Sequence, residues 1–145
     1  MRPARSLLVV VATILAFSVL APTVSATPHQ DFHLDKTCAS DVLCTLLDSN
    51  FKPFRPGTHV TYVTDWPNGL TYPTIKVRHG STTGICDWNH PHGSVFAKCT
   101  FSQGTGVLTG FHLVVDVTVT GDPGDPASIW HWDGRYWFGP QHGHR

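Results

Sequence analysis

Residues 107–120 read VLTGFHLVVDVTVT, a run of 14 residues in which apolar side chains recur at every second position. Such alternation is typical of a β-strand, because successive side chains of a strand point to opposite faces of the sheet. The even-numbered positions mix apolar, polar and charged side chains. The segment therefore predicts a strand with one mixed face and one apolar face, the latter made of Val107, Thr109, Phe111, Leu113, Val115, Val117 and Val119.

A straight strand of this length is too long for the chain that carries it. Fourteen residues at about 3.3 Å each span about 46 Å, whereas a domain of about 119 residues has a radius of gyration of about 13–14 Å. The strand must therefore bend, and Gly110 and Gly121 are the candidate bend points. A long coiling strand among shorter antiparallel ones predicts an all-β fold, a small antiparallel β-barrel or curled sandwich of about seven to eight strands.

Shorter patterns predict the neighbouring elements. Residues 58–64 and 74–79 alternate in the same way, and the Trp66-Pro67-Asn68-Gly69 cluster marks a turn between them. Asp133-Gly134, which separates residues 129–132 from residues 135–138, is typical of a two-residue hairpin turn. These signals add strands on both sides of residues 107–120.

The N-terminal part of the domain gives a different pattern. Residues 27–37 are polar and are interpreted as a loosely held segment. Ser40 is the expected cap of one short N-terminal helix that runs to about Asp48. Its apolar stripe consists of Val42, Leu43, Leu46 and Leu47.

The first 26 residues have the layout of a secretory signal peptide. Arg2 and Arg5 supply a positive start, an apolar run follows from Leu7 to Leu20, and small residues precede a cleavage site after Ala26. The apolar run is shorter than the roughly 20 residues of a spanning helix, so no membrane span is expected. Residues 27–145 are then a single disulfide-stapled β domain of a protein that is secreted after cleavage near Ala26.

Four cysteines lie in the expected mature chain, and an oxidising compartment favours two disulfides. Residues 85–99 predict two short strands around a turn at His92-Gly93, and this register sets Cys86 opposite Cys99. Opposed residues of a non-hydrogen-bonded pair lie about 4.5 Å apart, which a disulfide can span. Cys38 and Cys44 then form the second disulfide. No CxxC spacing is present, so zinc bound through these cysteines is not expected.

The segment CTFSQGTGVLTGF, from Cys99 to Phe111, resembles a recurrent element of the allene-oxide-cyclase and dirigent-like barrels. In that element a glycine-threonine-glycine turn, here residues 104–106, leads into a strand that carries another glycine a few residues on. The resemblance covers about a dozen of the 145 residues. It implies a secreted eight-stranded barrel with a small-molecule cavity, and it carries over no catalytic residue.

The aromatic hairpin predicted at residues 129–138 supplies the first candidate ligand site. Its register places Trp130, Trp132, Arg135 and Trp137 on one face. Exposed tryptophans would offer a stacking platform for a sugar ring or another flat ligand, whereas buried ones would close the core. We expect Trp130 and Trp137 to lie in the core, and Trp132, next to the turn, to be exposed.

His112 and Asp116 share the mixed face of the long strand and form the second candidate site. They lie about 13 Å apart along a strand, so they cannot hydrogen-bond with each other. If the mixed face lined a barrel interior, Asp116 would be a buried acid with a perturbed pKa. The alternative, which the threonines on this face favour, is a polar surface that points outward.

The ten histidines suggest metal binding, but their spacing identifies no site. The chain has no glutamate, so the helical metalloprotease motif is absent. Pro28 before His29 blocks an amine-and-amide copper site at the expected new N-terminus. The histidines are interpreted as scattered surface residues, and neither a metal nor a cofactor is assigned.

Composition and motifs narrow the function classes. In residues 27–145, eight Lys and Arg against ten Asp leave a net charge of −2, which excludes a strongly basic nucleic-acid binder. The chain has neither a GxSxG motif nor a glycine-rich phosphate loop. We interpret it as a secreted, non-enzymatic binding or interaction module whose partner is a small molecule, a glycan or a protein.

Two alternatives remain open: a small cofactor-free barrel enzyme of the cyclase or isomerase type, and a histidine-based metal-binding protein. The structure can separate the three functions. A deep cavity lined by His112 and Asp116 would favour the enzyme. An exposed tryptophan ledge would favour the binding module, and converging histidines would favour metal binding.

Overall fold

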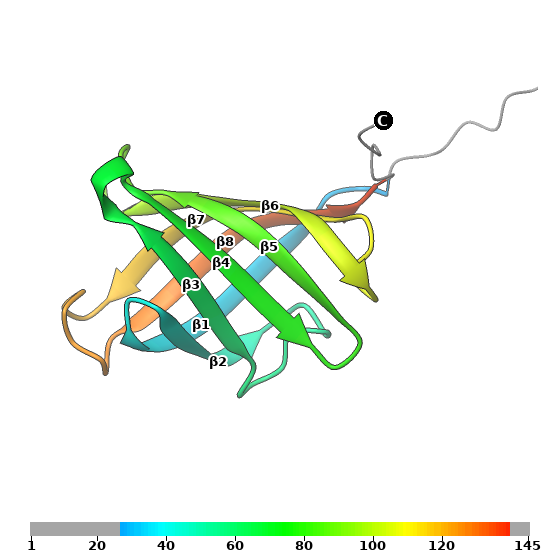
Figure 1. Cartoon of the computed structure of the whole chain (residues 1–145), viewed down its shortest axis with the longest axis horizontal. Helices are drawn as coiled ribbons and strands as arrows, with labels where there is room; N and C mark the ends of the chain where they lie inside the picture. The colour runs from blue at the N-terminus through cyan, green and yellow to red at the C-terminus, as the bar shows by residue number, and fades with distance from the viewer. Residues whose placement is uncertain (1–26, 140–145) are drawn as a thin grey trace, which may run out of the picture.

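The computed structural model describes residues 27–139, in which eight antiparallel strands, joined in sequence order, close into a barrel (Figure 1). A single 3-10 turn, η1 (Trp66–Asn68), links the third strand to the fourth. The predicted all-β barrel is confirmed. The strands are β1 (Gln30–Ser40), β2 (Leu43–Ser49), β3 (His59–Asp65), β4 (Leu70–Val77), β5 (Gly80–Asp87), β6 (Ala97–Gly106), β7 (Phe111–Thr120) and β8 (Ile129–Phe138).

Closure of the barrel depends on β1, which pairs with β2 on one side and with β8 on the other. Lys36 of β1, for example, lies between Leu46 of β2 and Trp130 of β8. Each strand therefore has two hydrogen-bonded neighbours and the sheet has no open edge, which removes the unpaired backbone groups that an edge strand would present.

The alternating segment forms β7, although only from Phe111 onward. Residues 107–110 form a turn after β6, with Gly106 at φ 58° and Gly110 at φ 74°, left-handed values that favour glycine. The strand therefore does not span the predicted residues 107–120, and Gly110 lies in the turn between β6 and β7 rather than at a bend within one strand. The odd-numbered residues of β7 from Phe111 to Val117 are buried, while the even-numbered ones are half-buried on the outer face.

The predicted N-terminal helix is wrong. Residues 30–49 form the β1–β2 hairpin, in which inward-facing Phe32, Leu34, Cys44 and Leu46 are buried. The other three residues of the expected apolar stripe, Val42, Leu43 and Leu47, are exposed instead. Pairing with β8 and β3 decides the outcome, because a short helix at this place would leave both of those strands with a free edge.

The predicted hairpin at Asp133-Gly134 is also wrong, because β8 runs straight through both residues. Gly134 lies opposite Val115 of β7 and Phe32 of β1. A Cβ atom at this position would collide with the backbone carbonyl oxygen of Val114. The glycine therefore serves a close approach of neighbouring strands rather than a turn.

Both predicted disulfides, Cys38–Cys44 and Cys86–Cys99, are present. Cys86 lies opposite Cys99 in the β5–β6 register, with a Cα–Cα distance of 4.0 Å. The connecting loop is looser than predicted. His92 pairs with Val95, so the turn lies at Gly93-Ser94 rather than at His92-Gly93.

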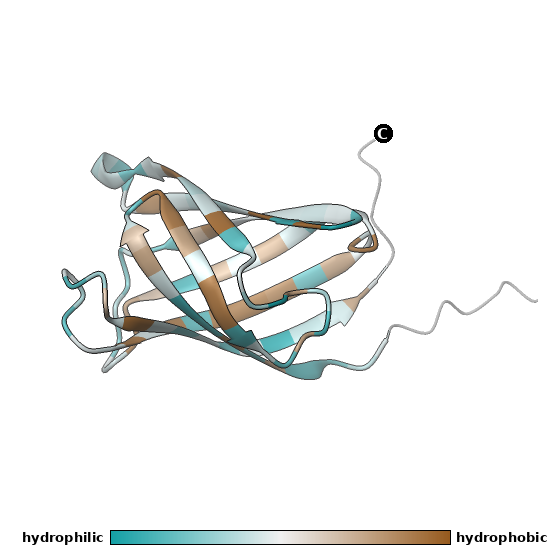
Figure 2. Ribbon diagram, turned by 90° about the horizontal axis from the view of Figure 1, so that it is seen from below, coloured by the Kyte–Doolittle hydropathy of each residue, from teal (hydrophilic) through white to brown (hydrophobic). Residues whose placement is uncertain are grey.

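The apolar core fills the middle and one end of the barrel. Hydrophobic residues alternate with polar ones along the strands (Figure 2). At one end, Phe51 and Phe54 from the β2–β3 connection fold inward and are buried. They pack in edge-on, tilted and stacked contacts against Phe32, Phe111 and Tyr136. This aromatic plug closes that end of the barrel.

The expected signal peptide at residues 1–26 lies outside the described residues. Within residues 27–139, no helix has the length and apolar character needed to cross a membrane.

Candidate functional site

A hollow of about 380 Å³ opens at the barrel end opposite the aromatic plug. Its walls come from the end of β1 and the following turn, from Tyr62 and Trp66, from Thr71 and Trp88, and from Trp130. The β7–β8 loop covers it with residues 123–126. We call it the mouth pocket. Mouths of β-barrels are common places for small-molecule sites.

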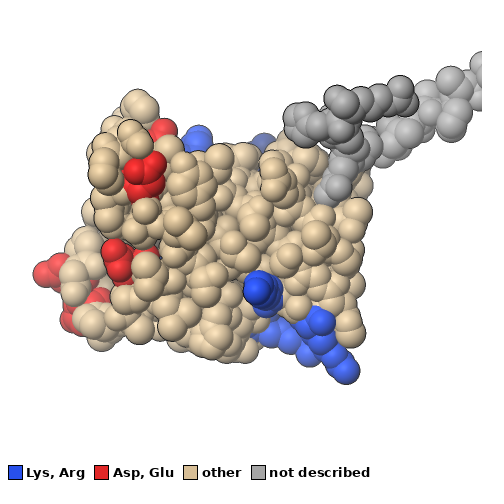
Figure 3. Space-filling view, viewed as in Figure 1, with Lys and Arg blue, Asp and Glu red and all other residues tan. Residues whose placement is uncertain are grey.

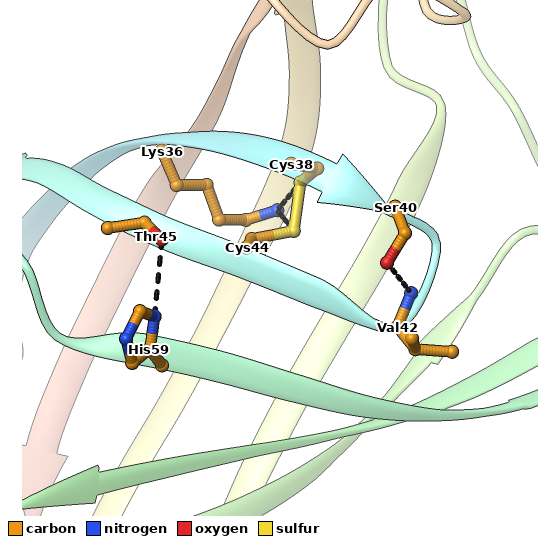
Figure 4. Close-up of a disulfide and its surroundings, with 7 residues drawn as sticks. All are labelled: Lys36, Cys38, Ser40, Val42, Cys44, Thr45 and His59. Atoms are coloured by element: carbon orange, nitrogen blue, oxygen red, sulfur yellow. Dashed lines mark hydrogen bonds between the residues drawn. A yellow bond between two sulfur atoms is a disulfide. The ribbon is translucent and has the colours of Figure 1, made fainter.

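The base of the mouth pocket carries Lys36, which is only 3% exposed. It shares the inward face of β1 with Phe32 and Leu34, at a position where the alternation of the strand predicts an apolar side chain. Figure 4 shows the side chain reaching from β1 to the disulfide that joins β1 and β2. Lys36 Nζ lies 3.6 Å from Cys38 Sγ and 3.7 Å from Cys44 Sγ.

No carboxylate of the described residues forms an ion pair with Lys36. Its amine instead lies 5.0 Å from the ring centroid of Trp132, 5.4 Å from that of Tyr62 and 5.7 Å from that of Trp130. Aromatic faces attract a cation, but they replace only part of the water that burial removes. Burial accordingly lowers the pKa of Lys36 to about 7.

Three tryptophans form a continuous aromatic wall at the opening. Trp88 packs edge-on against Trp66 at 5.9 Å and against Trp130 at 6.0 Å between ring centroids. The indole N–H of Trp88 donates to Thr71 Oγ1 at 3.0 Å, and that of Trp66 donates to Asp41 Oδ2 at 3.2 Å. These two bonds fix the ring planes, so the wall is formed before a ligand arrives.

Tyr62 completes the wall from β3. Burial raises the pKa of its phenol, so the hydroxyl stays protonated and can act as a hydrogen-bond donor. The polar groups of the pocket are thus few and set in apolar surroundings, as is typical of ligand sites.

The two ends of the barrel carry opposite charge. Aspartates gather around the mouth, while basic side chains gather at the plugged end (Figure 3). The residues at the mouth are Asp41, Asp65, Asp87, Asp122 and Asp125, each in or beside a connection at that end. The plugged end has a shallower hollow of about 480 Å³ around Lys52, Arg55, Lys76 and Arg78, but none of its lining residues is buried.

The structure places one of the six predicted ligand-binding residues in the mouth pocket, namely Trp130. The expected exposure of Trp132 is wrong, since it is 1% exposed and packs beside Phe101. The expected core position of Trp137 is also wrong: it lies half-buried on the outer face, between the rings of His29 and His112 at 4.4 and 5.2 Å. Trp130, Trp132 and Trp137 therefore do not form the exposed ledge that was the alternative to a core position.

The other three predicted residues are on the outer face as well. Arg135 is exposed, and His112 stacks on Trp137. Asp116 lies 3.7 Å from Lys98 Nζ. His112 and Asp116 follow the outward alternative, so the enzyme site that would have needed them inside the barrel is not formed.

The sequence reasoning missed Lys36, Tyr62, Trp66 and Trp88. A usable signal was present in residues 32–38, where Phe32, Leu34 and Cys38 alternate with polar residues as in a strand. That pattern puts Lys36 on the apolar face. It was overlooked because residues 27–37 were interpreted by their overall polarity.

Comparisons of the chain with protein-family models, with curated proteins and with solved structures give no match. The eight-stranded barrel agrees with the fold that the resemblance to allene-oxide-cyclase and dirigent-like proteins implies, but membership of that family is not shown. The site itself is a preformed aromatic pocket with the buried amine of Lys36 at its base.

Proposed function

We propose that the protein is a secreted binding protein that takes a flat, largely apolar carboxylate into the mouth pocket. The observation that carries the proposal is Lys36, whose amine is buried at the base of this pocket without a carboxylate partner among the described residues. Export is part of the proposal, and the two disulfides support it because such bonds persist in oxidising compartments.

The charged form of Lys36 is the costly one in the empty pocket. A buried ammonium without a partner is costly, whereas a hydrogen-bonded ion pair recovers much of the lost hydration energy. A ligand carboxylate at Nζ would provide that pair and would raise the pKa of the amine back toward its ordinary range. The Lys36 amine, which destabilises the protein when the pocket is empty, would then stabilise the bound ligand.

The aromatic lining of the mouth pocket indicates the shape of the ligand. Trp66, Trp88 and Trp130 offer edges and faces for stacking with a planar ring system. A volume of about 380 Å³ is at the lower end of the range for small-molecule sites. We therefore expect a ligand with one or two fused rings rather than a long chain or an oligosaccharide.

The lining residues favour binding over catalysis. Besides Lys36 and Tyr62, their ionisable side chains are Asp41 and Asp125, both exposed at the rim. Asp41 also accepts the indole hydrogen bond of Trp66. Among the described lining residues, Lys36 hydrogen-bonds only to the disulfide sulfurs and to no acid or base that could exchange a proton with it in a catalytic step.

The test is calorimetric titration of the purified protein with 2-naphthoate and with its uncharged analogue 2-naphthamide. Near pH 6, where Lys36 is charged, we expect naphthoate to bind at least about tenfold more tightly than the amide. Lys36→Met should abolish this preference while leaving amide binding unchanged. Lys76→Met, which removes an exposed lysine at the plugged end, is the matched control and should behave as the wild type.

The outcomes separate two parts of the proposal. Equal binding of both compounds, unchanged in Lys36→Met, would refute the role of the amine while keeping the pocket. If neither compound binds while circular dichroism shows an intact fold, the proposal that the pocket binds planar aromatic molecules is refuted.

A further inference from the structure

The outer face of the barrel, away from the mouth pocket, brings together two histidines and an aspartate from the strands that close it. His33 and Asp35 of β1 point outward, and in the β1–β8 register they lie opposite Asp133 and His131. One ligand atom from each of His33, Asp35 and His131 lies within 4.8 Å of the other two.

The distances show that the three groups converge on one point. Asp35 Oδ1 lies 3.1 Å from His33 Nε2 and 2.6 Å from His131 Nδ1. The two imidazole rings are nearly parallel, with centroids 6.3 Å apart and an interplanar angle of 22°. Two nitrogens and one oxygen therefore border the same small space on the surface.

The remaining nitrogen of each ring is held from outside the cluster. His33 Nδ1 lies 2.6 Å from Asp133 Oδ1, and His131 Nε2 lies 2.8 Å from Thr120 Oγ1. Histidines that bind metals are held in this way, because a partner on the second nitrogen fixes the tautomer and the direction of the first. Each imidazole thus has one nitrogen anchored and the other aimed at Asp35.

We propose that His33, Asp35 and His131 bind a divalent transition-metal ion such as Zn²⁺, with Asp133 and Thr120 as positioning residues. Two imidazole nitrogens and one carboxylate oxygen are a donor set that Zn²⁺ uses in proteins. Tetrahedral coordination at about 2.0–2.1 Å needs donor atoms about 3.3 Å apart. The pair at 3.1 Å already fits, and the pair at 2.6 Å must open slightly.

The site is accessible. The side chains of His33, Asp35 and His131 are 41%, 26% and 23% exposed, so an ion can enter from solvent and a water molecule can occupy the fourth position. The hydrogen bond with Asp133, reinforced by Asp35, raises the pKa of His33. Because the ion must displace a proton there, the test is best done at about pH 8.

The experiment is titration of the full chain with Zn²⁺, and with Co²⁺ to read the coordination from its visible absorption. We expect one equivalent to bind to the wild type, with the spectrum of four-coordinate Co²⁺. His33→Ala/His131→Ala should lose at least about tenfold in affinity and lose that spectrum. The matched control is His90→Ala/His92→Ala, which also removes two histidines, from an exposed loop, and should keep both.

A second variant separates loss of metal binding from loss of folding. Thr120→Val leaves all three ligands in place and removes only the partner of His131, so it should weaken binding by about tenfold while melting like the wild type without metal. Equal losses in the two double variants would overturn the proposal, because binding would then depend on histidine number. Wild-type affinity in His33→Ala/His131→Ala would overturn it as well.

Discussion

At the scale of single residues, Lys36 shows how one charged residue at an inward position of an alternating strand creates a site. Phe32, Leu34 and Lys36 occupy successive inward positions of β1, and all three are buried. The first two contribute to the core. The third brings an amine into surroundings that disfavour its charge, and burial lowers its pKa to about 7. The cost of this arrangement in the empty protein can be measured.

We expect Lys36→Met to stabilise the protein at pH 6 and to have a decreasing effect as the pH rises from about 7 toward 10. Below pH 7 the amine is charged in both states, and the folded state bears the full cost of its burial. Above pH 7 the unfolded chain binds more protons than the folded one, so the free energy of unfolding of the wild type rises with pH. Denaturant unfolding at pH 6, 7.5 and 9 measures the difference.

Lys76→Met controls for the loss of a lysine as such, and its effect should not follow this pH dependence. A Lys36→Met variant less stable than the wild type at pH 6 would show that contacts with Trp130, Trp132 and Tyr62 outweigh desolvation. A difference that stays constant from pH 6 to 9 would contradict the lowered pKa.

Trp132 supplies the second prediction at this scale. It is 1% exposed and packs against Phe101 of β6, so Trp132→Ala should lower the free energy of unfolding by about 3–5 kcal/mol. Trp137→Ala is the comparison, because Trp137 lies half-buried outside the barrel. It should cost clearly less in the same denaturant experiment, and the reverse order would mean that the two faces of β8 are misassigned.

At the scale of elements, the two disulfides act on different parts of the sheet. Cys86–Cys99 crosslinks β5 and β6 within the core, whereas Cys38–Cys44 crosslinks β1 and β2 beside the mouth pocket. Their sequence separations are 13 and 6 residues. The loop-closure model therefore gives the first the larger effect on the unfolded chain.

Replacing both cysteines of a pair by alanine should cost about 3 kcal/mol for Cys86–Cys99 and about 2 kcal/mol for Cys38–Cys44. Cys86 and Cys99 are also fully buried, so the first pair leaves a cavity and its loss should exceed the loop term. Urea unfolding at pH 7 tests the order of the two costs. A larger loss on removal of Cys38–Cys44 would show that this disulfide does more than close a loop, for example by supporting Lys36.

The elements also show what the sequence could and could not predict. The pattern of residues 111–117 predicts the buried face of β7 because an apolar residue recurs at every odd-numbered position. Asp133-Gly134 misled the prediction because a glycine required by the close approach of β7 looks the same as a glycine required by a turn. Val42, Leu43 and Leu47 misled it because spacing alone cannot distinguish a helix stripe from an exposed hairpin end.

The candidate sites were harder to predict than the fold, since both depend on contacts between distant segments. Lys36 meets Tyr62 and Trp130 only when the barrel closes. His33 and His131 are 98 positions apart and converge only through the β1–β8 register. A pattern within one segment contains no information on such a pairing.

At the scale of the whole molecule, the opposite charges of the two ends affect how ligands approach. An anionic ligand that pairs with Lys36 must first pass the aspartates of the mouth, among them Asp41 and Asp125. These exposed charges act over about 8–10 Å at ordinary salt concentrations. They should therefore slow the association of an anion more than they weaken its final contact with a buried amine.

We expect the association rate of 2-naphthoate to increase by about two- to threefold when the ionic strength is raised from about 20 to about 200 mM, while that of 2-naphthamide stays constant. Stopped-flow measurement of tryptophan fluorescence reports both rates. In Asp41→Asn/Asp125→Asn the naphthoate rate should be faster at low salt and should lose part of its salt dependence, because three aspartates remain at the mouth. A naphthoate rate that falls with salt would show that the cation dominates the approach.

The pairing of β1 with β8 has a practical consequence. Gln30 and Tyr136 are partners in that pairing, whereas the mouth pocket is built from the other ends of the same two strands, at Lys36 and Trp130. Both ends of the described chain therefore leave the barrel at the plugged end (Figure 1). A surface attached at residue 27 or residue 139 would hold each molecule with the mouth pocket turned away from that surface. In a circular permutant, a short linker could likewise join residue 139 to residue 27 and the chain could begin elsewhere, which would leave the ligand-binding end unobstructed.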